Sequence, residues 1–243
     1  MRYEDIIESL DEVDEILLAI KEKYNEATQD KNIKEIVKPK IKSALVQLRS
    51  CLDYCIKDID ELVLNRKSKE VYFPYKNSKK KFQETIHFNF PRLRNINPNI
   101  YLILESVQDF NNKEYPWLTT MCRKTNFNKH NKHTNQQRGD GSEKSIPGVI
   151  KIRDLPGAPP NRNIIIKGSK VEVSPGVLAS LNLKIDSNGE VVDYVSSHPK
   201  LSIERIDWVT FKIEGTDKDV LEFLTKSRIE IGKMIEKIYK EIQ

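Results

Sequence analysis

The hydrophobic positions at the start of the chain follow the spacing of two amphipathic helices. From residue 3 to residue 25 they alternate at intervals of four and three, which is the pattern of one buried helical face. These positions are Ile6, Leu10, Val13, Leu17, Ile20 and Tyr24. The pattern returns from about Pro39, since proline suits the first helical turn. Its positions are Ile41, Leu45, Leu48, Leu52, Cys55, Ile59 and Leu62. We expect the two helices to pack as an antiparallel hairpin.

The pattern weakens between residues 66 and 98, where three prolines and several lysines interrupt it. This segment predicts a long irregular crossover on the surface. Helical spacing resumes from Ile100 to Phe110, and a further helix is predicted from about Pro116. Residues 134–148 are polar and contain glycine, so they predict a loop.

The pattern changes again from Val149 to Gly215, where short runs of alternating apolar and polar residues are separated by turn sequences. Such runs are typical of a small antiparallel sheet. A last helix is predicted from about Asp217. The fold class is therefore α+β: a helical domain over 1–135, a sheet insertion over 149–215, and a C-terminal helix over 217–243 that packs back on the bundle.

Composition and charge limit the classes of protein to which the chain can belong. The net charge is only +5, so the overall balance is a weak argument for a polyanionic partner. No apolar run approaches the roughly 20 residues that span a bilayer, and the three cysteines are too few for a disulfide framework. We therefore expect a soluble cytoplasmic protein without a membrane partner.

Positive charge gathers in one stretch, CRKTNFNKHNKH at 122–133, which holds one arginine, two histidines, three lysines and no carboxylate. On a helix Asn126 and His130 share a face, and Arg123 lies one turn before Asn126. An arginine can hold a phosphate, an asparagine can donate to its oxygens, and a histidine can move protons near neutral pH. Such a stripe suits phosphodiester cleavage. The alternative is an ordinary basic helix end in solvent.

The same region contains residues that bind zinc in other proteins. Cys51 and Cys55 lie four apart, His130 and His133 lie three apart, and Cys122 precedes them. None of them has the short C-x2-C spacing of structural zinc modules, and cysteines at helical spacing are more often small core residues. We therefore expect neither a metal nor another cofactor.

The R-x6-H arrangement from Arg123 to His130 resembles the R-x4-6-H motif of the HEPN superfamily (higher eukaryotes and prokaryotes nucleotide-binding). These are all-helical proteins that include many metal-independent endoribonucleases of toxin–antitoxin and antiviral defence systems. Four segments are similar to bacterial HEPN-like and abortive-infection-like proteins, in the same order. They are LRSCLDYCIKDI at 48–59, VYFPY at 71–75, LESVQDF at 104–110 and TNFNKH at 125–130. The resemblance covers about residues 40–135.

The resemblance implies a metal-independent endoribonuclease in which the 2′-hydroxyl of the RNA attacks the adjacent phosphate. Arg123 would stabilise charge on the phosphate and His130 would transfer a proton, with Asn126 supporting them. Lys124 stands where the family often has Asn or His, and many members bind nucleotides or partners without cleaving. A non-catalytic module that binds a nucleotide, RNA or protein is therefore the alternative function.

Further residues are expected at the edge of this site. Lys124, Lys129 and His133 would bind substrate, and Asp53 on the inner helix would orient His130 or pair with Arg123. Aromatic residues are available for base stacking. They are Tyr72, Phe73, Tyr75 and Phe127.

The expected partners are RNA, either tRNA or mRNA, and a second copy of the chain in a homodimer. An antitoxin or another defence-system protein is a possible further partner. A third possibility is a structural protein whose acidic first helix pairs with basic loops across an oligomer interface.

Overall fold

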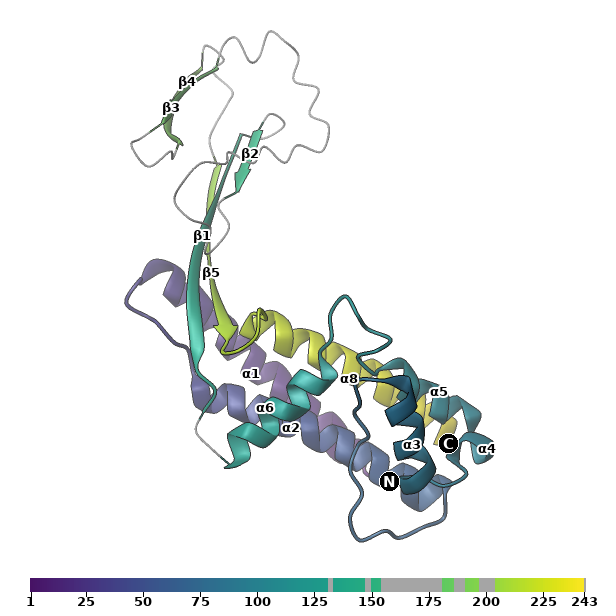
Figure 1. The fold of residues 1–243 in the computed structure, drawn as a ribbon. Helices are drawn as coiled ribbons and strands as arrows, with labels where there is room; N and C mark the ends of the chain where they lie inside the picture. The colour runs from purple at the N-terminus through teal and green to yellow at the C-terminus, as the bar shows by residue number, and fades with distance from the viewer. Residues whose placement is uncertain (131–132, 147–149, 154–180, 186–190, 197–203, 243) are drawn as a thin grey trace. The chain divides into compact units, whose positions relative to one another are not determined.

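The computed structural model describes residues 1–130, 133–146, 150–153, 181–185, 191–196 and 204–242. The chain divides into two compact units, which are described separately. The first unit comprises Met1–Glu26, Ile33–Gln137 and Phe211–Gln243, and the second comprises Ala27–Asn32 and Arg138–Thr210. The described residues are mostly helical, with a small antiparallel sheet before the C-terminal helix (Figure 1).

Helices α1 (Tyr3–Gln29) and α2 (Lys38–Asp58) form the predicted antiparallel hairpin. Cys51 of α2 lies against the backbone of Ile6, whereas Gln47 donates a 2.6 Å hydrogen bond to Glu12. The later residue of α2 thus contacts the earlier residue of α1, which shows that the two helices are antiparallel. The predicted apolar faces are buried, except that Leu17 is only partly buried and Leu62 is half exposed.

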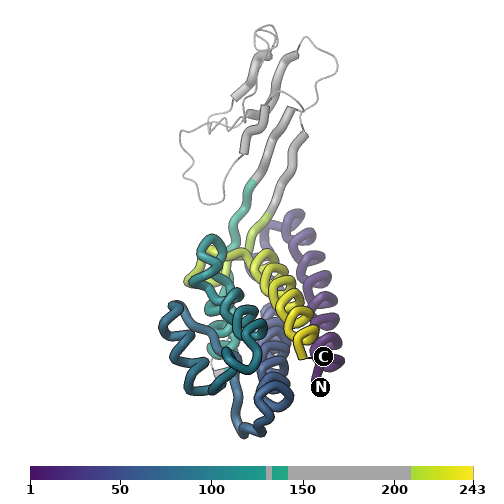
Figure 2. The backbone as a smooth tube through the Cα atoms, turned by 90° about the vertical axis from the view of Figure 1, so that its right-hand side faces the viewer, coloured from purple at the N-terminus to yellow at the C-terminus, as the bar shows by residue number. Residues whose placement is uncertain are grey.

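Helix α8 (Val220–Ile242) packs against α2 and α5 in the same unit, as expected for the C-terminal segment. It also runs beside α1, and both chain ends lie at one end of the bundle (Figure 2). Tyr3 and Tyr239 hold these ends together, with ring centroids 4.7 Å apart. At the opposite end of α8, Asp219 accepts hydrogen bonds from the Tyr24 hydroxyl and the Phe211 backbone, both at 2.8 Å.

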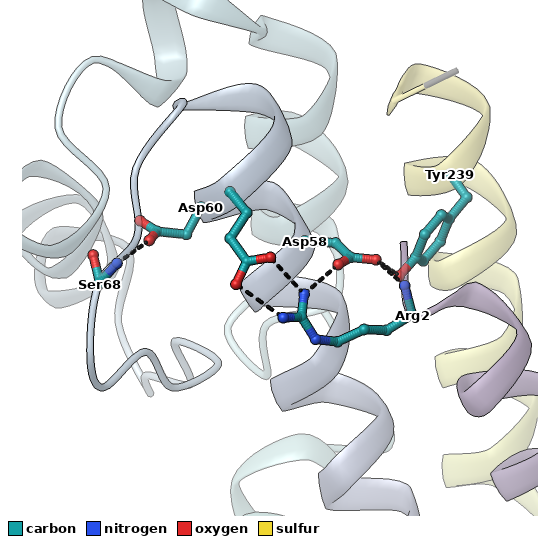
Figure 3. Close-up of polar contacts among 6 residues, drawn as sticks. Arg2, Asp58, Asp60, Ser68 and Tyr239 are labelled. Atoms are coloured by element: carbon teal, nitrogen blue, oxygen red, sulfur yellow. Dashed lines mark hydrogen bonds and ion pairs between the residues drawn. The ribbon is translucent and has the colours of Figure 1, made fainter.

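Helix α2 continues into a π-helical turn, η1 (Ile59–Val63), with a buried carboxylate just before the turn, Asp58, and another within it, Asp60. Asp58 accepts hydrogen bonds from the backbone nitrogen of Arg2 and from the hydroxyl of Tyr239, and its other oxygen pairs with the Arg2 guanidinium (Figure 3). Asp60 points the other way and accepts a 3.0 Å bond from the Ser68 backbone (Figure 3). The turn therefore ties α1, α8 and the following crossover together.

The prediction that residues 66–98 lack regular structure is wrong in its second half. Helix α3 (Lys79–Asn89) and the short α4 (Leu93–Ile96) lie there. Ser78 caps α3 by accepting from the backbone of Lys81, and only Phe82 and Ile86 give it a buried face. Two apolar positions are too few to make a recognisable periodic pattern, which explains the error.

Two further helices follow where the sequence predicts them. They are α5 (Pro98–Ser106) and α6 (Leu118–His130). No helix among the described residues is long and apolar enough to span a membrane.

The strands begin earlier than predicted. Strand β1 (Gln136–Ile146) occupies the segment predicted to be a loop and pairs antiparallel with β2 (Ile150–Arg153). On its other side β1 neighbours β5 (Glu204–Ile213). Because β1 pairs on both sides, backbone hydrogen bonds support a strand whose side chains are polar. The predicted strands between residues 163 and 173 lie outside the described residues.

A second, two-stranded sheet lies in the same part of the chain. In it β3 (Leu181–Ile185) pairs antiparallel with β4 (Val191–Ser196).

Candidate active site

Helix α6, which carries the Arg123 to His130 spacing, is anchored at its start by a carboxylate from the preceding loop. Asp109 accepts hydrogen bonds from the backbone nitrogens of Leu118 at 3.0 Å and Thr119 at 2.9 Å. These nitrogens lack partners within the helix, so Asp109 acts as its N-terminal cap. One face of α6 packs against α2, where the buried Thr125 hydroxyl donates to the Leu45 carbonyl at 3.1 Å.

The opposite face of α6 is exposed and holds the predicted catalytic residues. Arg123 and Asn126 are exposed, and Arg123 makes no hydrogen bond or ion pair with any residue that the structure describes. His130 is the last residue of the helix, and its side chain lies outside the described residues. Its Cα lies nearly two turns beyond Arg123, about 10 Å along the axis and on the same face.

The flanking cations have different environments. Lys124 is partly buried and donates a 2.7 Å hydrogen bond to the carbonyl of Glu214. Lys129 and His133 are exposed. Just after α6 the chain is held by the buried Asn128, whose side chain accepts from the backbone and the hydroxyl of Thr134. His133 therefore stays close to the end of α6.

Asp53 does not pair with Arg123. One of its oxygens accepts from Nε of Arg49 at 2.9 Å, and the other accepts from the backbone nitrogen of Phe73 at 2.9 Å. With both oxygens engaged, Asp53 has a structural role between α2 and the crossover of residues 64–78. The idea that it orients His130 stays a prediction, because the side chain of His130 is not described.

Arg49, which the sequence analysis missed, lies beneath the exposed face of α6 that carries Arg123 and Asn126. Its side chain is buried, with Nη1 2.9 Å from the Cys122 sulfur and the guanidinium 5.2 Å from the centre of the Tyr75 ring. The hydroxyl of Tyr75 in turn lies 3.5 Å from Nδ2 of Asn126. The four-residue spacing of Arg49 and Asp53 could have indicated their ion pair. The contacts with Cys122 and Tyr75 depend on tertiary structure.

The aromatic residues predicted to stack on bases divide into two groups. Phe73 is only 2% exposed and belongs to the core, so that part of the prediction is wrong. Tyr72 is 60% exposed and Phe127 is 41% exposed, while Tyr75 is partly buried. Phe127 lies one turn after Arg123, on the exposed face of α6.

The three cysteines are core residues, as expected. Burial raises the pKa of Cys122 to about 11 despite the neighbouring Arg49, and it raises the pKa of Cys51 to about 12. Burial likewise raises the pKa of Cys55, with Asp58 adding to the effect. Protonated thiols are poor metal ligands and poor nucleophiles. Within the described part of the chain, no group of three or more His, Cys, Asp or Glu residues is placed to hold a metal ion.

Comparison of the chain with protein-family models, with curated proteins and with solved structures gave no significant match.

Proposed function

We propose that the protein is a metal-independent endoribonuclease of a bacterial defence or toxin–antitoxin system, with Arg123 and His130 on α6 as its catalytic pair. The observation that carries the proposal is Arg123, which is exposed and has no ion-pair partner among the described residues, on the face that it shares with Asn126. Arg2, Arg49, Arg66 and Arg228 of the same unit are each paired with a carboxylate. Arg92 is also exposed and has no carboxylate partner among the described residues, so the face shared with Asn126 and the spacing to His130 distinguish Arg123. An arginine without such a partner remains available to bind phosphate.

In the proposed reaction the 2′-hydroxyl oxygen of the RNA attacks the adjacent phosphorus, and the bond from phosphorus to the 5′-oxygen breaks. The products are a 2′,3′-cyclic phosphate and a 5′-hydroxyl end, so no external oxidant, reductant or water is consumed. Arg123 stabilises the charge on the non-bridging oxygens. His130 accepts the 2′-hydroxyl proton or donates one to the leaving oxygen.

A homodimer fits this chemistry, because cleavage needs one group to accept a proton and another to donate one. One α6 supplies a single Arg123 and His130 pair, whereas two copies around one cleft would supply both groups. The dimer, an antitoxin partner and the membership of the HEPN superfamily all belong to the proposal.

The second candidate is a module that binds RNA or a nucleotide without cleaving it. The exposed Phe127 beside Arg123 favours it, because base stacking and phosphate contact suffice for binding. Lys124 at the position after Arg123 also favours it, since its side chain is engaged by Glu214.

The test is incubation of the wild-type protein with total RNA and with a tRNA mixture in EDTA, followed by analysis of the fragment ends. Arg123→Ala and His130→Ala are compared with Lys80→Ala, which removes an exposed cation from α3 instead. We expect cleavage with cyclic phosphate ends by the wild type and Lys80→Ala only. Intact RNA with all four folded proteins, together with RNA binding that Arg123→Ala weakens, would favour the binding module.

A further inference from the structure

Tyr75 lies beside the exposed face of α6 that carries Arg123 and Asn126. It belongs to a different part of the chain, the crossover of residues 64–78. Its hydroxyl oxygen accepts a hydrogen bond from Nδ2 of Asn126 at 3.5 Å, at the outer limit for such a bond. A phenol that accepts one bond keeps its own proton to donate, and the amide of Asn126 has a second N–H. Both groups can therefore donate to one further acceptor oxygen beside them, and Arg123 lies one turn away on the same helix face.

The backbone on both sides of Tyr75 is held by side chains from distant segments. Gln108 is fully buried; its Nε2 donates to the carbonyl of Pro74 at 3.0 Å, and its Oε1 accepts from the nitrogen of Lys76 at 2.9 Å. Two residues before Tyr75, Asp53 accepts from the nitrogen of Phe73 at 2.9 Å. An irregular segment is thus fixed by three hydrogen bonds around one tyrosine.

The ring of Tyr75 is fixed as well. The guanidinium of Arg49 lies 5.2 Å from the ring centre, within the range of a cation–π contact. Arg49 is itself immobilised, since it is 6% exposed and paired with Asp53. Functional side chains need supports of this kind, because loosely held groups lose the geometry of the site.

We propose that Tyr75 contacts the substrate, its hydroxyl donating to a non-bridging phosphate oxygen of the RNA beside Asn126 and Arg123. The inference rests on the proposed site at α6 and adds a specificity for the sugar–phosphate backbone over the bases. In this proposal Arg49, Asp53 and Gln108 have the same role, since they position Tyr75 without touching the RNA.

The test measures binding of a fluorescently labelled 2′-O-methyl RNA oligonucleotide, which lacks the attacking hydroxyl and stays intact, at several KCl concentrations. Tyr75→Phe keeps the ring over Arg49 and removes only the hydroxyl. We expect it to weaken binding roughly tenfold, as for a hydrogen bond to a charged group. Tyr54→Phe on α2 is the matched control, because it removes the hydroxyl of a tyrosine that is 39% exposed and has no role in the proposed site. We expect it to bind like the wild type.

The salt dependence of RNA binding distinguishes the contact made by Arg123 from the contact made by Tyr75. Replacing Arg123 by alanine should make the slope of log K against log salt shallower by about 0.7, since one fewer phosphate charge is neutralised. Tyr75→Phe should weaken binding by the same factor at every salt concentration, because a neutral hydroxyl displaces no counterion. A shallower slope for Tyr75→Phe would overturn the inference, as it would show that the substitution displaces a cation instead.

The remaining outcomes distinguish the two proposals. Wild-type affinity in Tyr75→Phe, with weakened binding in Arg123→Ala, would overturn the role of Tyr75 and leave the α6 site standing. If the wild type neither binds the oligonucleotide nor cleaves RNA, the proposed function fails and the role of Tyr75 fails with it.

Discussion

The hydroxyl of Tyr239 on α8 donates a 2.6 Å hydrogen bond to the carboxylate of Asp58, which is 1% exposed at the end of α2. The same carboxylate accepts from the backbone of Arg2. The start of the chain, the end of α2 and the C-terminal helix α8 therefore meet at one buried carboxylate. A buried carboxylate is tolerated only where donors surround it, so each of these donors should contribute to stability.

Tyr239→Phe should lower the free energy of unfolding by about 1–3 kcal/mol, because a buried acceptor loses a partner while the ring packing against Tyr3 is kept. Urea unfolding monitored by circular dichroism measures this. Tyr54→Phe, on the same helix as Asp58 but 39% exposed, serves as the control and should change stability by less than about 0.5 kcal/mol. Equal stability of both variants would contradict the structural role of the Tyr239 hydroxyl.

Alkaline pH should destabilise the protein through its cysteines. The pKa of Cys122 is about 11 and that of Cys51 about 12 in the folded protein, against an ordinary value of 9.0. A folded pKa above the unfolded one means that the folded state binds more protons at high pH. The stabilisation is thus complete below about pH 8 and is lost as the pH rises from 9 towards 11.

Urea unfolding at pH 7, 8, 9 and 10 measures this loss. The triple variant Cys51→Ala, Cys55→Ala and Cys122→Ala is the control, because its free energy of unfolding should fall less steeply over the same range. If the wild type and this variant show the same slope above pH 8, the thiols do not carry the effect.

Replacing Arg49 by alanine should lower stability, whereas replacing Arg123 by alanine should affect RNA binding instead. Arg49→Ala leaves the Asp53 carboxylate without its cation and removes the support of Tyr75, so we expect a loss of about 3 kcal/mol or more in stability. Arg123→Ala should change stability by less than about 0.5 kcal/mol, because the side chain is exposed and has no ion-pair partner among the described residues. Its effect should instead be on RNA. Thermal unfolding and RNA binding of the two variants together check this contrast.

The success of the sequence analysis follows the strength of each local pattern. Helices α1, α2 and α8 are long and periodic, and all three were predicted. The predicted buried faces of α1 and α2 are confirmed except at Leu17 and Leu62. Helix α3 was missed because only Phe82 and Ile86 are buried along it. Strand β1 was missed because its polar side chains carry no alternation, and its pairing with β2 and β5 is a tertiary property.

The candidate site shows the same limit. Arg123 and Asn126 were placed on one exposed face by helical spacing alone. Asp53 was expected near them, yet its partners are Arg49 and the backbone of Phe73. The choice of partner depends on how the crossover folds over α2, which no spacing in the sequence indicates. Gln108, which braces Tyr75 from a distant segment, was missed for the same reason.

The cap of α6 gives a last prediction, which links a loop residue to the candidate site. Asp109→Ala removes both acceptors of the Leu118 and Thr119 nitrogens and takes a negative charge from the positive end of the helix. We expect a loss of about 1–2 kcal/mol in the free energy of unfolding. The amides at the start of α6 should also exchange hydrogen faster, which mass spectrometry of peptides covering 117–122 can detect.

Asp109→Asn is the matched control, since its amide oxygen can still accept one of the two hydrogen bonds, and its loss of stability should be smaller. The cap acts on the first turn of α6, whereas His130 lies at the last position and is supported from the other end by Asn128 and Thr134. RNA binding should therefore fall less in Asp109→Ala than in Arg123→Ala. If Asp109→Ala abolished RNA binding while its hydrogen exchange stayed like the wild type, Asp109 would belong to the site itself and not to its scaffold.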